Sequence, residues 1–204
     1  MQTIPFILFG YLSGSVLYAR IFARMFGKKD MLENSKDKNP GTANAFMYGG
    51  FWCGILTLIF DLLKGFVPVF LYMRYAQNLQ PDRLKTALVL AAPVVGHAFP
   101  FFYKMKGGKG IAVTFGCLLG LLPMWKPVII LVTYFLFFSC ILRVTPHFYR
   151  TLAAYFCSLG SMAFRVDQPA VFISFAIITI VVCIRMHLSV EKKEKMRIKL
   201  LWMH

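Results

Sequence analysis

The sequence is a series of long apolar segments separated by short polar loops that hold most of the basic residues. Of its 204 residues, 58% are hydrophobic and only 15% are charged. A soluble domain is about 45–50% apolar, so these charges are too few to cover a water-exposed surface of this size. The apolar runs are continuous rather than alternating, which favours helices over the strands of a barrel. We therefore predict an all-α, polytopic membrane bundle that forms a single domain over residues 1–204.

The apolar segments predict about seven transmembrane helices, which cover approximately residues 3–25, 45–76, 84–97, 111–122, 128–142, 151–164 and 170–186. The first segment runs directly into a basic stretch, so we expect it to be a retained span and not a cleaved signal peptide. The second is too long for an untilted span of roughly 20 residues, and Gly65 and Pro68 predict one long kinked helix. The basic tail over 191–199 predicts an interfacial helix.

The net charge of +15 is distributed unevenly between the loops. With seven spans, the most basic loops, which include 27–44, 104–109 and 143–150, fall on the same side as the C-terminal tail. The positive-inside rule then predicts an N-terminus outside and a C-terminus in the cytoplasm. Such basic loops point to anionic headgroups and not to nucleic acid. The five cysteines lie in apolar segments without a Cys-x-x-Cys pair, which is typical of packed thiols.

Residues 96–110 read Gly-His-Ala-Phe-Pro-Phe-Phe-Tyr-Lys-Met-Lys-Gly-Gly-Lys-Gly and lie between two apolar segments. Glycines at 107, 108 and 110 allow backbone N–H groups to approach an oxyanion, and the lysines add positive charge. The turn is not a Walker A loop. A flexible basic turn at the headgroups is the alternative, and the turn in isolation fits it better than it fits a phosphate site.

A second polar stretch, 39–44, reads Asn-Pro-Gly-Thr-Ala-Asn. Its Pro-Gly turn presents the hydrogen-bonding side chains of Asn39, Thr42 and Asn44. The threonine or the second asparagine could equally cap the following helix, and a cap and a ligand can share one loop.

Four ionisable residues lie within or at the ends of apolar segments. Asp61 and Lys64 have the i,i+3 spacing of an intrahelical pair, which we expect to orient a polar site. His97 and His187 are predicted to lie on the cytoplasmic side, either as interfacial residues or as part of a site beside the glycine turn. The sequence has no metal-ligand spacing and no nucleophilic triad.

Taken together, these motifs resemble the acyl-phosphate-dependent glycerol-3-phosphate acyltransferases, small bacterial inner-membrane enzymes of phospholipid synthesis. That family reads Asn-Pro-Gly-Ala-Thr-Asn in the first loop, Asp-x-x-Lys-Gly in the second helix and Gly-His-x-Phe-Pro-x-Phe-x-x-Phe-Lys-Gly-Gly-Lys-Gly at the third motif. The matching stretches here are 39–44, 61–65 and 96–110.

The resemblance implies a seven-helix bundle with a cytoplasm-facing site in the bacterial cell membrane. It implies transfer of a fatty acyl group from acyl phosphate to the 1-hydroxyl of glycerol 3-phosphate, which gives lysophosphatidic acid and phosphate. The partners would be these two substrates and membrane lipids, with no cofactor, no metal and no nucleic acid.

The resemblance also implies roles for individual residues. The expected catalytic residues are His97, His187, Asn39 and Arg150. The expected substrate-binding residues are Ser35, Thr42, Asn44, Asp61, Lys64, Lys106, Gly107, Gly108, Lys109 and Gly110.

The chain departs from the family pattern at several positions. The family has an arginine where this chain has Met47, and its closing motif, Arg-His-x-x-Asn, ends in an asparagine where this chain has Val190. The family's first loop has a Ser-Gly whose serine aligns with Lys36 or Asp37, or with Ser35 if the loop is shifted.

These departures leave room for replacements and for a different function. The family's loop before the sixth span reads Arg-Tyr-Val-Ser-Leu, where this chain has Tyr-Arg-Thr-Leu over 149–152. Arg150 is a candidate to replace the charge missing at Met47, and Thr151 is a candidate to replace the serine hydroxyl. A divergent, non-catalytic or altered-acceptor relative that binds a phosphorylated lipid or metabolite is the alternative function. A small-anion transporter is disfavoured, because the motifs cluster on one predicted face.

Overall fold

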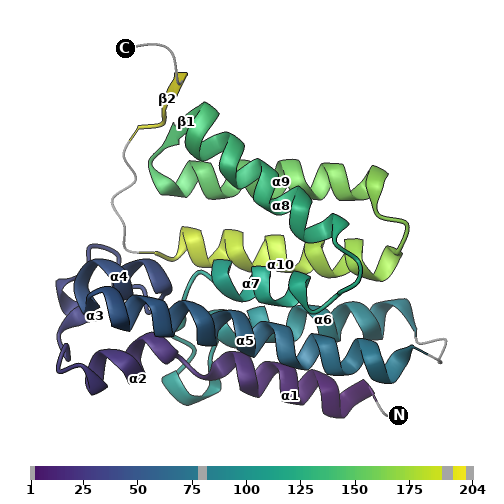
Figure 1. The fold of residues 1–204 in the computed structure, drawn as a ribbon, viewed down its shortest axis with the longest axis horizontal. Helices are drawn as coiled ribbons and strands as arrows, with labels where there is room; N and C mark the ends of the chain where they lie inside the picture. Colours follow the sequence, from purple (N-terminus) through teal and green to yellow (C-terminus); the bar gives the residue numbers. More distant parts are fainter. Residues whose placement is uncertain (1–2, 78–81, 190–194, 201–204) are drawn as a thin grey trace.

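The computed structural model describes residues 3–77, 82–189 and 195–200. Most of their helices run along one common direction (Figure 1). In chain order, the elements are α1 (Thr3–Ser15), α2 (Tyr18–Met25), α3 (Met31–Asn34), α4 (Thr42–Gly49), α5 (Phe51–Ala76), α6 (Arg83–Ala98), η1 (Phe101–Tyr103), α7 (Ile111–Leu119), α8 (Lys126–Leu136), η2 (Phe137–Ile141), β1 (Leu142–Thr145), α9 (His147–Arg165), α10 (Pro169–His187) and β2 (Arg197–Leu200).

Four helical stretches are long and apolar enough to cross a membrane, namely Thr3–Met25, Phe51–Ala76, Arg83–Tyr103 and Pro169–His187. A shorter apolar helix covers Lys126–Ile141. At 1.5 Å per residue, spans of this length reach about 30–40 Å, the thickness of a bilayer. The prediction of a helical chain with membrane-spanning helices is confirmed.

The first predicted span is interrupted at Val16 and Leu17, between α1 and α2. An interruption at membrane depth releases backbone carbonyls that need another donor. The ammonium of Lys64 supplies one, because it donates to the carbonyl of Val16 over 2.7 Å. The buried lysine therefore stabilises the break in the first span.

The prediction of one kinked helix over 45–76 is wrong, because two helices, α4 and α5, cover this segment. The chain turns at Gly50, whose φ of 91° lies in the region that residues with a Cβ rarely adopt. Helix α5 itself continues through Pro68. The turn between the two helices brings α4 back against α5, so that the 39–44 loop faces the middle of α5.

The predicted interfacial helix over 191–199 is also wrong where the structure describes it. Residues 197–200 form β2, which pairs antiparallel with β1 from Leu142 opposite Leu200 to Thr145 opposite Arg197. The short alternation of basic and apolar residues in Arg-Ile-Lys-Leu fits the period of a strand. Residues 191–194 lie outside the described part of the chain.

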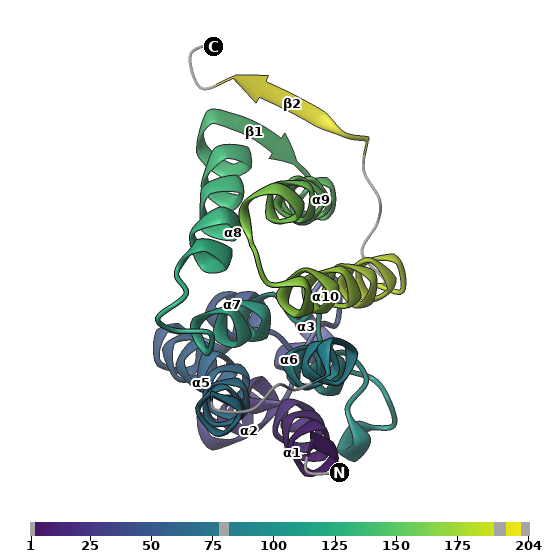
Figure 2. The same cartoon turned by 90° about the vertical axis from the view of Figure 1, so that its right-hand side faces the viewer.

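The contact between α1 and α6 depends on two glycines that face the partner backbone. A Cβ on Gly14 would overlap the backbone of Pro93, and a Cβ on Gly96 would overlap the carbonyl of Tyr11. Small residues of this kind let membrane helices approach backbone to backbone. Viewed along the helices (Figure 2), α1, α5, α6 and α7 lie on one side of α10, and α8, α9 and the strands lie on the other.

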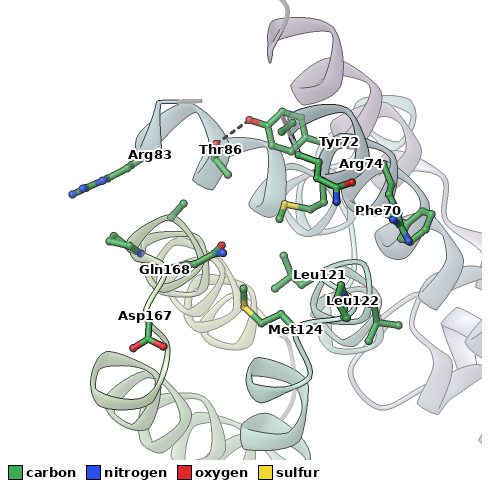
Figure 3. Close-up of a pocket in the computed structure, with 16 residues that line it drawn as sticks. Phe70, Tyr72, Arg74, Arg83, Thr86, Leu121, Leu122, Met124, Asp167 and Gln168 are labelled. Atoms are coloured by element: carbon green, nitrogen blue, oxygen red, sulfur yellow. Dashed lines mark hydrogen bonds between the residues drawn. The ribbon is translucent and has the colours of Figure 1, made fainter. Parts of the chain in front are cut away.

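The two ends of this bundle differ in chemistry. The loops that hold the polar motifs meet at the end where α4 lies (Figure 1). The opposite end contains a cavity of about 670 Å³, at whose edge Tyr72 and Thr86 share a hydrogen bond and Arg74 packs over Phe70 (Figure 3). The sequence motifs at 39–44, 61–65 and 96–110 contribute nothing to the lining of that cavity. The candidate site therefore lies at the α4 end.

Candidate functional site

A cavity of about 690 Å³ lies where the 39–44 loop, α5, α6 and the start of α7 meet. Its polar lining residues include Asn39, Thr42, Asn44, Asp61, His97 and Lys109. Its apolar lining residues include Phe46, Met47, Leu58, Ile111 and Phe115. A few polar groups on an otherwise apolar lining are typical of a ligand site, and here they suit an amphiphile.

A buried polar chain of three residues supports the polar lining. The ammonium of Lys64 lies 2.7 Å from the carboxylate of Asp61 and 2.8 Å from Nδ1 of His97, and all three side chains are buried. Thr42 donates its hydroxyl to the other carboxylate oxygen over 3.4 Å. An ammonium can only donate, so Nδ1 of the histidine accepts and its proton lies on Nε2. The Nε2–H of His97, which lies beside Gly108, can therefore donate a hydrogen bond, but the ring is not poised to remove a proton.

The glycine turn packs closely on the end of α6. The N–H of Gly108 donates to the carbonyl of His97 over 3.0 Å, and a Cβ on this glycine would overlap the imidazole ring. The guanidinium of Arg185, in α10, donates to the carbonyl of Gly107. The backbone N–H of Gly108 is therefore used within the fold, and the absence of a side chain here makes room for the histidine.

The start of α7 is the part of the turn that faces the cavity. Gly110, at φ 80°, precedes the helix, and Gly110, Ile111 and Ala112 line the cavity. N–H groups in the first turn of a helix have no partner within the helix, and the helix dipole favours an anion there. The anion-binding geometry expected of the glycine turn thus lies at Gly110 and the residues that follow it.

Lys109 does not face the cavity as an isolated cation. Its ammonium lies 2.8 Å from one carboxylate oxygen of Asp37, and the side chains of Lys109 and Asp37 are only 9% and 13% exposed. The other oxygen accepts from the side chain of Asn44 over 2.6 Å and from the backbone N–H of Asn39 over 3.2 Å. Burial raises the pKa of Asp37, but the donors from Lys109 and Asn44 outweigh it, so this pKa lies below its usual range.

A second cavity, of about 620 Å³, lies on the far side of this ion pair. Asp37, Asn39 and Lys109 line both cavities and so form the wall between them. The second cavity is strongly cationic, since it is also lined by Arg20, Lys29, Lys38, Lys106 and Arg185, with Glu33 as a further acid. Such a field favours an anionic headgroup.

The structure brings most of the predicted site residues together. Asn39, Thr42, Asn44, Asp61, His97, Lys109 and Gly110 line the first cavity, whereas Lys106 and Gly107 line the second. Lys64 forms a hydrogen bond with His97, and Gly108 packs against the imidazole ring of His97.

Three predicted residues lie elsewhere. Ser35 is buried and donates its hydroxyl to the carbonyl of Leu32 over 2.8 Å, inside its own loop. His187 is exposed at the end of α10, and neither it nor Arg150 lines either cavity. Instead, His147 lines the first cavity and shares a hydrogen bond of 2.7 Å with Thr151, so the threonine hydroxyl orients this histidine.

The prediction missed Arg20, Asp37 and Arg185 as site residues. The signal for Arg185 was present in the sequence, because an arginine near the end of an otherwise apolar helix is costly unless it has a partner. Asp37 entered only as one possible position for an aligned serine, and its pairing with Lys109 requires the fold.

Known proteins that are similar to this chain belong to the family that these motifs suggest. Residues 4–194 match the family model described as glycerol-3-phosphate acyltransferase. The chain belongs to this family. A glycerol-3-phosphate acyltransferase of Shewanella loihica is 34% identical over 142 residues, which are 66% of this chain and 68% of that protein.

Other acyltransferases of the family match over shorter regions. The protein of Legionella pneumophila (strain Corby) is 44% identical over 113 residues, 55% of this chain and 39% of its own length. That of Actinobacillus pleuropneumoniae serotype 5b is 42% identical over 115 residues, 56% of each chain. The chain thus spans about half the length of these relatives, or less.

A solved structure shares the fold. The crystal structure of PlsY, an integral membrane glycerol 3-phosphate acyltransferase in its glycerol 3-phosphate form, superposes with a TM-score of 0.76. The match has 22% sequence identity and covers 92% of this chain and 89% of that chain.

The first loop now has a preferred register against the family's Ser-Gly. Lys38 has a φ of 49°, a left-handed conformation that a glycine adopts most easily. This conformation favours Lys38 as the counterpart of the family's glycine, so we expect Asp37 at the position of the family's serine.

Proposed function

We propose that this chain transfers a fatty acyl group from acyl phosphate to the 1-hydroxyl of glycerol 3-phosphate, producing lysophosphatidic acid and phosphate. The observation that carries the proposal is the pair of adjoining cavities, one amphipathic and one cationic, that share Asn39 and Lys109. An acyl phosphate needs an apolar wall beside an anion site, and a phosphorylated acceptor needs a second anion site within reach. Membership of the acyltransferase family supports the same reaction.

In this reaction the acceptor hydroxyl oxygen attacks the acyl carbon, and the bond from that carbon to the phosphate oxygen breaks. The hydroxyl proton passes to the departing phosphate, so no group of the protein has to remove it. What the protein must supply is positive potential where charge develops on the carbonyl and phosphate oxygens. The α7 N-terminus and the Nε2–H of His97 meet that need at the first cavity.

We assign the remaining residues by where they lie. Asn39 and Thr42 position the substrates in the first cavity, and Asp61 and Lys64 position His97. The cationic cavity, including Lys106, binds the phosphate of the acceptor. Arg150 and His187 receive no part in the chemistry, because both lie outside the two cavities.

We further propose a seven-span topology in a bacterial inner membrane, with the N-terminus outside and the C-terminus in the cytoplasm. The shorter helices α7 and α8, together with the 19-residue α9, would complete the seven spans. The orientation is supported by the gathering of the most basic loops at the α4 end, which would face the cytoplasm. Cytoplasmic substrates could then reach both cavities.

The test is phosphate release by the purified full-length chain in detergent, given acyl phosphate with and without glycerol 3-phosphate. We expect release that depends on the acceptor and that falls at least about tenfold in Asn44→Ala, because this amide holds the Asp37 carboxylate and the Asn39 carbonyl in the wall shared by the two cavities. Asp167→Asn, an exposed change at the opposite end, is the matched control and should retain full activity. No acceptor-dependent release by a folded protein would reject the proposal.

A further inference from the structure

The carboxylate of Asp37 lies where a substrate oxyanion would be expected to bind. Three donors converge on it: the ammonium of Lys109, the side-chain amide of Asn44 and the backbone N–H of Asn39. An ammonium, an amide and a backbone N–H are the kinds of donor that hold a phosphate or carboxylate ligand. All three belong to residues that line the first cavity.

The position of Asp37 explains why it can act on both substrates. Its side chain is 13% exposed and forms part of the wall between the amphipathic and the cationic cavity. A ligand phosphate that approaches Lys109 from either side therefore meets this carboxylate. At close range two anions repel each other strongly in a site that is screened little by water.

The arrangement also argues against a role for Asp37 as a base. Both of its oxygens already accept from donors, and those donors stabilise the charged form. The neighbouring Lys38 holds a left-handed conformation without being glycine, a strained conformation that persists only where surrounding contacts fix the loop.

We propose that Asp37 is the resident anion of Lys109 and determines the anion selectivity of the site. It neutralises Lys109, so that a substrate phosphate binds mainly through the cationic cavity and the α7 N-terminus and competes with Asp37 for the lysine. The consequence for the proposed acyl transfer, on which this inference builds, is weak retention of the phosphate product beside Lys109.

The test measures binding of inorganic phosphate to the purified full-length protein, by calorimetry in detergent, without acyl phosphate. Asp37→Asn keeps the shape of the side chain and removes its charge. We expect phosphate to bind at least about tenfold more tightly to this variant, because a unit negative charge beside the ligand has been removed. The control Asp167→Asn, which removes a carboxylate at the opposite end, should leave phosphate binding unchanged.

A second pair of variants tests whether Lys109 is the residue that binds phosphate once the charge of Asp37 has been removed. Lys109→Met should weaken phosphate binding at least about threefold more in the Asp37→Asn background than in the wild-type background, because the lysine contacts the ligand fully only when Asp37 no longer holds it. Such coupling identifies two residues that act on one ligand. Equal losses in the two backgrounds would overturn the inference.

Other outcomes are equally decisive. Unchanged or weaker phosphate binding by a folded Asp37→Asn protein would overturn the inference and assign Asp37 to holding the loop. Asp37→Ser provides a second variant. If neither variant folds, Asp37 is assigned to holding the loop and the inference is overturned. Tighter phosphate binding by the Asp37 variants, with no acyl transfer by any protein tested, would support the inference and reject the acyltransferase function. Acyl transfer without tighter phosphate binding would support the acyltransferase function and reject the inference.

Discussion

Lys64 connects the candidate site to the break in the first span. Its ammonium pairs with Asp61, bonds to His97 and donates to the carbonyl of Val16, and it is only 4% exposed. Lys64→Met keeps most of the side-chain volume and removes these contacts. Asp61 would then be a buried charge without its cation, and removing one partner of a buried pair costs about 3–5 kcal/mol.

For a protein of this size that loss corresponds to a fall of about 10 °C in the midpoint of thermal unfolding. The assay is unfolding of the purified protein in detergent, followed by circular dichroism. Lys126→Met is the matched control, because the pair of Lys126 with Asp167 spans 3.7 Å at the exposed surface and should contribute less than about 1 kcal/mol.

A double variant distinguishes the loss of the pair from the loss of a lysine side chain. Asp61→Leu with Lys64→Met removes both charges, so it should be more stable than Lys64→Met alone. The reasoning is refuted if Lys64→Met unfolds at the same temperature as Lys126→Met, or if the double variant is less stable than the single one.

Three further predictions concern the turn and the ion pair. Gly108→Ala should lower the rate of phosphate release at least about tenfold, measured with saturating substrates, because the new methyl group displaces the ring of His97; unchanged activity would contradict this packing. Arg185→Met should raise the KM for glycerol 3-phosphate more than it lowers kcat, since this arginine supports Gly107 and lines the cationic cavity; an effect on kcat alone would place it elsewhere in the mechanism. The lowered pKa of Asp37 means that its stabilising contribution is present above about pH 4, the ordinary carboxyl value, and is lost as pH falls through the lower folded-state pKa. The midpoint difference between the wild type and Asp37→Asn should therefore shrink below about pH 4, and a difference that is constant down to pH 2 would refute the assignment.

The apolar segments alone predicted most of the helices, because membrane spans depend mainly on continuous hydrophobicity. They did not predict the end of α4 at Gly50, since a glycine within an apolar run does not reveal the sign of its φ. Strand β2 was missed for a different reason. Its four residues are stabilised by β1, which lies more than fifty positions earlier, and no local pattern records such pairing.

The site motifs were found from sequence because each has an unusual local composition, but their geometry was not. His187 was expected in the site, yet Arg185 occupies it. Two residues along a helix rotate the side chain by about 200°, so only one of this pair can face the cavity. Likewise, nothing in the sequence around Asp37 indicated that Lys109, more than seventy positions later, would be its partner.

The central claim is acyl transfer to glycerol 3-phosphate, and the most direct measurement is the balance of its two products. The full-length chain would be given acyl phosphate and glycerol 3-phosphate, with lysophosphatidic acid measured by mass spectrometry and phosphate by a colorimetric assay. We expect one lysophosphatidic acid for each phosphate released, and a parallel fall of both products in Asn44→Ala. Phosphate without acylated glycerol 3-phosphate, or no product from a folded protein, would contradict it.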